Sequence, residues 1–223
     1  MPIDKLEYIF DPLCGWCYAS APALDWLAAT FSHQLYLLPS GLFAGEGARP
    51  ITPEWAAHAW KNDQRIAQLT GQPFSGQYHH LLLSGARFDS GALNLALTAF
   101  RQISSAAEAG LLHELQAARY VRGEDTARGD VVLKISQAYA AVHHPHLSPS
   151  LTADIFAPGS ELADLTQQRI SGVQRLMRSN GISGVPLLLV TVAGKTHAIS
   201  GSDLYGGAES INNALDKLGC ISH

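Results

Sequence analysis

Two cysteines three positions apart are the residues whose types and spacing predict chemistry in this sequence. Cys14 and Cys17 enclose the dipeptide Gly15-Trp16, just after an apolar run and at the start of a helical pattern. A thiol at a helix N-terminus faces unpaired backbone N–H groups and the positive end of the helix dipole, which favour the thiolate. Cys17 would lie one turn further along, within reach of a mixed disulfide formed on Cys14. The spacing therefore predicts thiol–disulfide exchange, with Cys14 as the nucleophile and Cys17 as the resolving thiol.

Two other interpretations of the cysteine pair stay open. A structural zinc site needs four ligands, and the only further cysteine, Cys220, is far away in the sequence. Histidines would have to complete such a site, and His143, His144 and His146 are the obvious donors. The pair could also be two small buried hydrophobic residues without chemistry. We expect no metal at the pair and regard Cys220 as a bystander.

The elements that must position the pair follow from the hydrophobic pattern. Residues 6–10 predict a buried strand, 14–31 a helix in which Pro22 should produce a kink, and 35–38 a second strand. Residues 185–192 and 196–200 predict a β-hairpin around the turn Ala193-Gly194. Helices are predicted at 54–69 (with Thr52 as cap and Pro53 at the first position), 91–101, 106–121, 130–142, 161–178 and 209–218. Residues 200–203 are expected to form only a turn.

The order of these elements predicts an α/β fold with a large insertion. A βαβ unit at the start and a ββα unit at the end would together form a small sheet with helices on its faces. A long, almost entirely helical pattern separates the two units. We therefore expect residues 1–51 and 181–223 to form one domain and residues 52–180 to form a helical insertion domain.

A second motif joins the helical block to the hairpin. It reads Gly-Ile-Ser-Gly-Val-Pro and ends at Pro186, at the start of an apparently central strand. Proline cannot donate a hydrogen bond to the strand ladder, so this position is unfavourable for regular pairing. A cis Val185–Pro186 bond would resolve the conflict by placing a tight bend there.

Together, the two motifs resemble the DsbA-like branch of the thioredoxin superfamily. Residues 10–18, Phe-Asp-Pro-Leu-Cys-Gly-Trp-Cys-Tyr, are similar above all to its FrnE-type and predicted protein-disulfide-isomerase members. The resemblance implies a thioredoxin-like βαβ–ββα core with a large all-helical insertion. It also implies that Cys14 is the exposed nucleophile, that Cys17 is its partner, and that Pro186 is a cis proline packed beside them. Val185 would then offer its backbone to a substrate strand.

The sequence departs from this family in its dipeptide. Gly15-Trp16 replaces the Pro-His of the strongly oxidising periplasmic enzymes, in which the histidine helps to stabilise the thiolate. The N-terminus shows no basic and apolar pattern typical of a secretory signal, which also differs from those enzymes. We therefore do not expect a strong oxidant, and we predict a cytoplasmic protein.

Composition excludes several kinds of partner. Only 15% of the 223 residues are charged and the net charge is -4, so there is no electrostatic footprint for nucleic acid. No window approaches the ~18 apolar residues of a membrane span. The expected partners are protein or small-molecule disulfides and thiols, with glutathione as a candidate redox partner and no metal or organic cofactor.

An alternative function keeps the fold but changes the reaction. A glutathione-dependent transferase or isomerase would act on a small hydrophobic molecule beside Cys14. Its pocket would be roofed by aromatic residues of the insertion, namely Trp55, Trp60, Phe74 and Phe88. A third hypothesis is a metal-binding protein that uses Cys14 and Cys17 together with histidines.

Three residues around the pair have secondary roles in these hypotheses. Trp16 and Tyr18 would flank the thiols and shape an apolar docking surface for substrate. Asp11 precedes Cys14 by three positions and is expected to end the strand and favour the turn. A role for Asp11 in proton transfer is the alternative.

Overall fold

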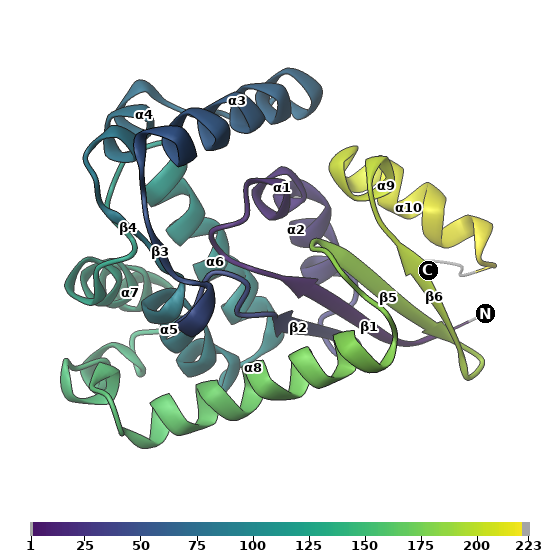
Figure 1. Ribbon diagram of the computed structural model, residues 1–223. Coiled ribbons are helices and arrows are strands. Elements are labelled where there is room, and N and C mark those ends of the chain that lie inside the picture. The colour runs from purple at the N-terminus through teal and green to yellow at the C-terminus, as the bar shows by residue number, and fades with distance from the viewer. Residues whose placement is uncertain (1, 220–223) are drawn as a thin grey trace.

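The computed structural model describes residues 2–219 and centres on a four-stranded mixed sheet (Figure 1). The strands are β1 (Ile3–Phe10), β2 (Leu35–Pro39), β5 (Leu187–Val192) and β6 (Lys195–Ile199). Their order is β2-β1-β5-β6, with β1 and β2 parallel and the other two pairs antiparallel. The α/β class with a βαβ–ββα core is therefore confirmed.

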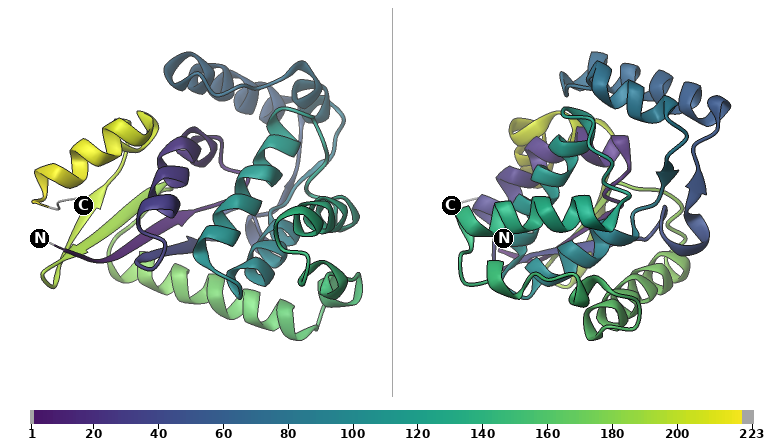
Figure 2. Two further views of the ribbon diagram at one scale, coloured as in Figure 1. Left: turned by 180° about the vertical axis from the view of Figure 1, so that it is seen from behind. Right: turned by 90° about the vertical axis from the view of Figure 1, so that its left-hand side faces the viewer.

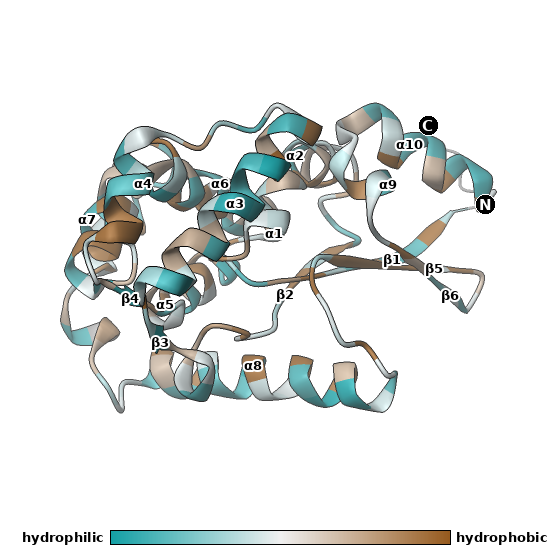
Figure 3. Cartoon of the chain, turned by 45° about the horizontal axis from the view of Figure 1, so that its top comes forward, coloured by the Kyte–Doolittle hydropathy of each residue, from teal (hydrophilic) through white to brown (hydrophobic). Residues whose placement is uncertain are grey.

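Helices cover both faces of the sheet (Figures 1 and 2). One face carries α1 (Gly15–Ala19), α2 (Ala21–Thr30), α9 (Ser202–Tyr205) and α10 (Gly207–Lys217), with α10 packed on α2. The long helix α8 (Glu161–Ser179) runs across the other face and packs on β2. Strand β5 is accordingly hydrophobic, and β1 becomes so toward its C-terminal end, whereas the edge strand β6 is mostly polar (Figure 3).

The remaining helices form a block beside the sheet. They are α3 (Pro53–Thr70), α4 (Gly76–Leu83), α5 (Gly91–Arg101), α6 (Ser105–Tyr120) and α7 (Gly129–His143). Three short 3-10 helices (Gly45–Gly47, Ser148–Ser150 and Asp154–Phe156) and a two-stranded ribbon of β3 (Arg49–Pro50) and β4 (Arg87–Phe88) complete the chain. In Figure 1, α3 and α4 lie above α1, so the block reaches over the first helix of the sheet domain.

Several local signals in the sequence explain where these elements begin, turn and end. The Thr52 side chain accepts a hydrogen bond from the Trp55 N–H at 3.2 Å and begins α3. Gly181 adopts a positive φ of 64° just after α8, which is the conformation that a glycine stop supplies. Ala193 and Gly194 both have positive φ, as the two-residue hairpin turn between β5 and β6 requires.

Three predicted elements differ from the structure. The helix expected over 14–31 is two helices, because the chain leaves helical geometry at Ser20 and Pro22 occupies the first turn of α2, where its missing N–H costs nothing. The strand expected from residue 185 begins at Leu187 as β5, since Pro186 cannot donate to the ladder. Residues 200–203 are not only a turn, because a one-turn helix, α9, begins at Ser202.

The larger of two hydrophobic clusters extends through the sheet and the helical block, and a smaller one of Ile9, Val173 and Leu189 lies between the sheet and α8. The larger cluster includes Leu6 and Tyr8 from β1 together with Phe100, Leu112 and Tyr120 from the helices. The division into residues 1–51 with 181–223 and residues 52–180 stays a prediction. In the part of the chain that the structure describes, no helix combines the length and apolarity needed to cross a membrane.

Candidate functional site

Cys14 lies at the junction between β1 and α1. It is the N-cap residue of α1, and its backbone carbonyl accepts the N–H groups of Cys17 and Tyr18 at 2.9 and 3.0 Å. The Cys14 side chain makes no capping hydrogen bond, so the sulfur is not used to begin the helix. The thiol is therefore held at a helix N-terminus with 8% of the residue exposed.

Cys17 occupies a different environment although it lies on the same turn. It is 1% exposed, and neither cysteine is in a disulfide. Burial raises the pKa of the Cys17 thiol, and the neighbouring Cys14 side chain raises it further. Cys14 is thus also buried, unlike the exposed nucleophile that the resemblance implied, but it is less enclosed than Cys17.

The loop before β5 brings the second motif to the cysteines. The Cys14 thiol lies 3.9 Å from the carbonyl oxygen of Val185, to which it can donate a hydrogen bond. The Val185–Pro186 bond is cis, as the resemblance implied. Val185 is half-buried and Pro186 is buried. The structure thus brings Cys14, Cys17, Val185 and Pro186 together from two ends of the chain.

Val185 also lies at the end of an open groove. The groove has a volume of about 600 Å³ and passes between α8 and the loop after β2. Its lining is largely uncharged and includes Ile170, Gln174 and Met177 from α8. A substrate segment that contacts the Val185 carbonyl would have this groove beside it.

Of the two aromatic residues beside the pair, only Trp16 is placed to flank the site. Its ring packs on Tyr205 of α9 with centroids 4.7 Å apart. Tyr18 is instead buried, and it stacks on Tyr120 at 4.7 Å and meets the edge of Phe74 at 5.4 Å. The predicted role of Tyr18 in a docking surface is wrong, because the helical block covers that side of α1.

Asp11 is fully buried and ties the site to the helical block. One carboxyl oxygen accepts the N–H of Leu13 at 2.9 Å, which forms the predicted turn. The other oxygen accepts the N–H of Phe43 at 3.1 Å and the hydroxyl of Ser90 at 3.0 Å. Burial raises the pKa of Asp11 to about 6, although these three hydrogen bonds oppose the shift.

A second buried acid, Asp63 on α3, was not found by sequence reasoning. It lies against the first residue of α1, so that a Cβ on Gly15 would be 2.5 Å from Asp63 Oδ1. Its other oxygen accepts a hydrogen bond from the Tyr78 hydroxyl at 2.9 Å. Burial raises the pKa of Asp63 to about 7, and the nearby charge of Arg119 opposes the shift. In the sequence, the only signal for Asp63 is the position of an acidic side chain in the middle of an amphipathic helix.

Cys14, Gly15 and Trp16 line a small cavity under the helical block. Its volume is about 130 Å³, close to that of an engineered apolar cavity that takes up benzene. Trp55 and Phe88 contribute to its wall, as predicted, together with residues that were not predicted, such as Tyr78 and Tyr120. Trp60 and Phe74 lie outside the lining, since Trp60 stacks on His79 and Phe74 packs on Tyr18 and Tyr120. Two of the four aromatic residues predicted to cover the pocket, Trp55 and Phe88, therefore line the cavity.

The predicted metal alternative finds no cluster of ligands. Within residues 2–219, no three His, Cys, Asp or Glu side chains come together as a metal site would require. His143 ends α7 and stacks beside Tyr139, with ring centroids 4.4 Å apart, away from the cysteine pair. Cys220 lies outside the described residues.

Fold and site together define the class of structure. A mixed sheet with a thiol pair at the start of its first helix, a cis proline beside it and an inserted helical block is the DsbA-like form of the thioredoxin fold. The structural neighbours of the chain are DsbA-like oxidoreductases of the thioredoxin superfamily, which confirms the resemblance seen in the two motifs.

Individual solved structures can be named within that class. The cytosolic disulfide reductase DsbM from Pseudomonas aeruginosa is similar with a TM-score of 0.78 and 26% identity, over 96% of this chain and 98% of that one. The same protein has been solved with GSH. A "putative protein disulfide isomerase" from Nitrosomonas europaea is similar with a TM-score of 0.72 and 25% identity, over 96% of each chain.

One further solved structure shows similarity in fold alone, and two other comparisons found no match. A 2-hydroxychromene-2-carboxylate isomerase shares the fold with a TM-score of 0.56 and 13% identity, over 96% of this chain and 97% of that one. No family model and no curated protein matches the sequence.

Proposed function

We propose that this protein is a thiol–disulfide oxidoreductase in which Cys14 attacks and Cys17 resolves. The observation that carries the proposal is the unequal placement of two free thiols on one helical turn, with Cys14 at the helix N-terminus and Cys17 enclosed behind it. The similarity to the disulfide reductase DsbM over almost the whole chain supports the same chemistry.

The steps of this reaction follow from the geometry. The Cys14 thiolate attacks one sulfur of a substrate disulfide, so that a mixed disulfide forms and the other substrate sulfur leaves as a thiolate. The Val185 carbonyl and the groove beside it hold the substrate segment next to Cys14. Cys17 loses its proton and attacks Cys14 Sγ, which releases the second substrate thiol and leaves a Cys14–Cys17 disulfide. Burial raises the pKa of the Cys17 thiol and so favours its protonated form in the reduced protein.

The proposed direction is reduction of substrate disulfides, with reduced glutathione as the electron donor. The dipeptide Gly15-Trp16 offers no imidazolium to stabilise the Cys14 thiolate, and DsbM, which is named a reductase, was solved with GSH. Glutathione would return the Cys14–Cys17 disulfide to two thiols and become glutathione disulfide. A cytoplasmic location fits this direction.

Reduction of insulin disulfides by reduced glutathione tests the proposal. The wild-type protein should accelerate the reaction, and Cys14→Ser should reduce the rate to that of glutathione alone. Wild-type turnover in the Cys14→Ser variant would contradict the proposal. The reduction potential of the Cys14–Cys17 pair against glutathione then tests the direction, because a strong oxidant would have a potential near the DsbA value of about −120 mV.

A second candidate function rests on the cavity beside Cys14. Its volume of about 130 Å³ and its aromatic wall would accept roughly one aromatic ring of a small hydrophobic substrate. A glutathione-dependent transferase or isomerase would need Cys14 but not Cys17. Retention of small-molecule turnover in Cys17→Ser, together with loss of insulin reduction, would favour this candidate.

A further inference from the structure

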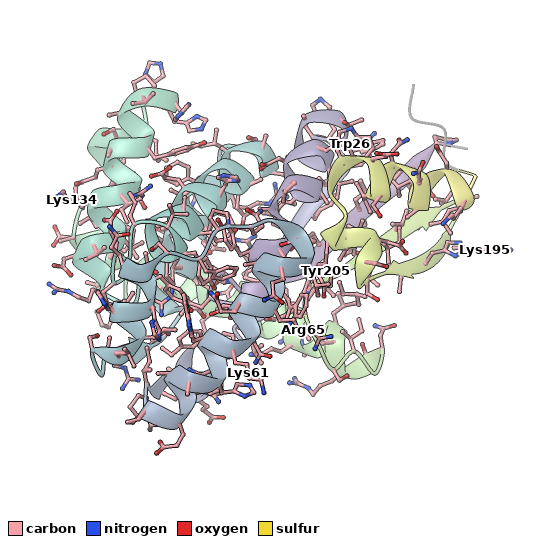
Figure 4. All side chains as sticks on the ribbon, turned by 90° about the horizontal axis from the view of Figure 1, so that it is seen from above. Trp26, Lys61, Arg65, Lys134, Lys195 and Tyr205 are labelled. Atoms are coloured by element: carbon pink, nitrogen blue, oxygen red, sulfur yellow. The ribbon has the colours of Figure 1, made fainter. Side chains whose placement is uncertain are left out.

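Two exposed cations, Lys61 and Arg65, stand one turn apart on α3, the helix that packs on α1. Lys61 and Arg65 are separated by four positions, so their side chains share one face of the helix. Seen from above, both lie on α3, and Arg65 is directed toward α9, where Tyr205 lies (Figure 4). The helical block therefore presents positive charge at the border with the sheet domain.

Arg65 is held over a residue of the cysteine motif itself. Its guanidinium carbon lies 6.0 Å from the centre of the Trp16 ring, which is a cation–π distance. The other neighbour of Trp16 is Tyr205, whose pKa is raised by burial and then by the charges of Cys14 and Cys17. Arg65, Trp16 and Tyr205 thus form one stack beside the thiols.

The charge of this stack is not compensated within the protein. Some other arginines of the described residues have carboxylate partners, such as Arg122 with Glu114 and Glu124 at 2.7 Å and Arg128 with Asp130 at 2.7 Å. The ion pairs within residues 2–219 include neither Lys61 nor Arg65. Asp63 lies between them in sequence but faces inward, where it binds the Tyr78 hydroxyl. A local positive rim therefore stands beside the nucleophile in a chain whose net charge is -4.

We propose that Arg65, with Lys61, recognises a carboxylate of a small anionic disulfide and steers it onto Cys14. This inference rests on the proposed function and names its substrate class, a carboxylate-bearing low-molecular-weight disulfide. The carboxylate accepts hydrogen bonds from the N–H groups of Arg65, while the contact with Trp16 holds the guanidinium beside the thiol pair. The positive rim also increases the association rate of anionic substrates relative to neutral ones.

The chemical step balances without a further reactant when the protein starts in its reduced form. The Cys14 thiolate bonds to one sulfur of the small disulfide, and the other sulfur leaves as a thiolate. Cys17 then gives up its proton and bonds to Cys14, which releases the second sulfur as a thiolate. The protein loses two electrons in forming one disulfide, and the small disulfide gains them as two thiols.

Single-turnover oxidation of the reduced protein by three disulfides tests this inference. The probes are glutathione disulfide, which is net negative, bis(2-hydroxyethyl) disulfide, which is neutral, and cystamine, which is net positive. Acid quenching followed by thiol alkylation gives the second-order rate constant for each. For the wild-type protein, the rate constant for glutathione disulfide should fall as salt is added, while that for the neutral disulfide should not.

The decisive quantity is the ratio of the rate constants for glutathione disulfide and the neutral disulfide. Arg65→Gln should lower this ratio about fivefold, and Lys61→Gln/Arg65→Gln about tenfold or more, as expected for the loss of exposed charge pairs. Arg65→Lys should restore most of the ratio, and Arg65→Glu should make cystamine the faster substrate. Lys134→Gln on α7 removes one exposed positive charge away from the site and should leave the ratio at the wild-type value (Figure 4).

The outcomes separate this inference from the proposed function. If no disulfide oxidises the reduced wild-type protein, the proposed function is wrong. If all three disulfides oxidise it but Arg65→Gln leaves the ratio unchanged, or lowers it no more than Lys134→Gln does, the inference is wrong and the proposed function stands. A ratio that falls in Arg65→Gln and recovers in Arg65→Lys supports both.

Discussion

Cys14 and Cys17 share one helical turn but differ in what surrounds their sulfurs. Cys14 begins the helix, lines the cavity, and lies 3.9 Å from the carbonyl oxygen of Val185, which borders the groove. Cys17 points into the core, where burial favours the neutral thiol. Because only the first thiol meets solvent-accessible space, a mixed disulfide can form on Cys14 but hardly on Cys17.

This asymmetry predicts the behaviour of the two cysteine variants. Cys17→Ser should accumulate a stable mixed disulfide on Cys14 when it is mixed with glutathione disulfide, because nothing resolves the intermediate. Cys14→Ser should accumulate little, since Cys17 is 1% exposed. Intact-protein mass spectrometry would detect one added glutathionyl group. Equal labelling of the two variants would contradict the assigned order of attack.

Asp11 makes the stability of the protein dependent on pH. Its pKa is about 6 in the folded protein, raised from 3.8 chiefly by burial. When a carboxyl group has a higher pKa in the folded protein than in the unfolded chain, its contribution to stability is fully present at pH values below the unfolded-state pKa. This contribution is lost as the pH rises through the folded-state pKa. Asp11 should therefore contribute a loss on the order of 3 kcal/mol in the free energy of unfolding between about pH 4 and pH 7.

Asp11→Asn separates this charge effect from the hydrogen bonds. The amide has one acceptor oxygen where the carboxyl group has two, so either Leu13 or Phe43 loses its acceptor, at a cost of about 1–3 kcal/mol. At pH 7 the variant is spared the penalty of burying a carboxylate. Urea denaturation should therefore show a larger destabilisation by Asp11→Asn at pH 4 than at pH 7. The opposite order would show that the Asp11 carboxyl is not protonated on folding at low pH.

At the residue scale, sequence alone predicts the parts of the site that are close in the chain. The CxxC spacing identifies Cys14 and Cys17, and proline chemistry identifies Pro186. Asp63 and Tyr120 were missed because their approach depends on how α3 and α6 pack over α1. The Tyr120 hydroxyl donates to the Leu13 carbonyl at 2.8 Å across 107 positions, which no local pattern reports.

At the scale of elements, α3 packs so closely on α1 that the residue after Cys14 must be small. A Cβ on Gly15 would lie 2.5 Å from Asp63 Oδ1 and 3.1 Å from Ile66 Cδ1. Asp63 cannot move aside freely, because it accepts the Tyr78 hydroxyl in a buried site. The glycine in the dipeptide is thus a consequence of the helical insertion.

Gly15→Ala should therefore destabilise the protein by about 1–3 kcal/mol, as overpacking usually does. Alanine would otherwise be favoured over glycine within a helix by up to ~1 kcal/mol. Gly129→Ala is the matched control, since Gly129 also begins a helix and a Cβ there meets nothing within 4 Å. Thermal or urea denaturation should show loss of stability for Gly15→Ala and none for Gly129→Ala. Equal effects would mean that α3 does not constrain α1.

Elements with long periodic patterns were predicted well, and short ones were not. The predicted helix at 91–101 coincides with α5, because its apolar residues recur at helical spacing and Gly91 and Arg101 bound it. The short helices α4 and α9 and the ribbon of β3 and β4 were missed. Each is stabilised by tertiary contacts, as when Ile51 beside β3 donates its N–H to the Ala86 carbonyl beside β4, and so leaves no periodic signal.

At the scale of the whole molecule, one buried ion pair connects the helical block to the sheet. Arg169 of α8 donates hydrogen bonds to Glu108 of α6 and, at 2.6 Å, to the backbone carbonyl of Leu37 in β2. The Glu108 side chain is fully buried and that of Arg169 is 14% exposed. Burial raises the pKa of Glu108 to about 7, although Arg169 opposes the shift. This ion pair therefore joins α6, α8 and β2, which are far apart in the sequence. Each of its two charges is compensated by the other.

Breaking this pair from one side should be costly because it leaves a buried charge alone. Glu108→Gln and Arg169→Met should each lower the free energy of unfolding by about 3–5 kcal/mol at neutral pH. The double variant should be destabilised by clearly less than the sum, because neither charge then remains uncompensated.

The exposed pair of Arg128 and Asp130 provides the control for this double-mutant cycle. Its side chains are 61% and 67% exposed, so its coupling energy should be only about 0–1 kcal/mol. Urea denaturation of the four proteins in each cycle gives both coupling energies. Additive effects in the Glu108–Arg169 cycle would mean that the two charges do not stabilise each other and that this ion pair does not hold the helical block on the sheet. A strong coupling would instead make this ion pair a specific link between the block that carries Arg65 and Asp63 and the sheet whose first strand leads into the cysteine pair.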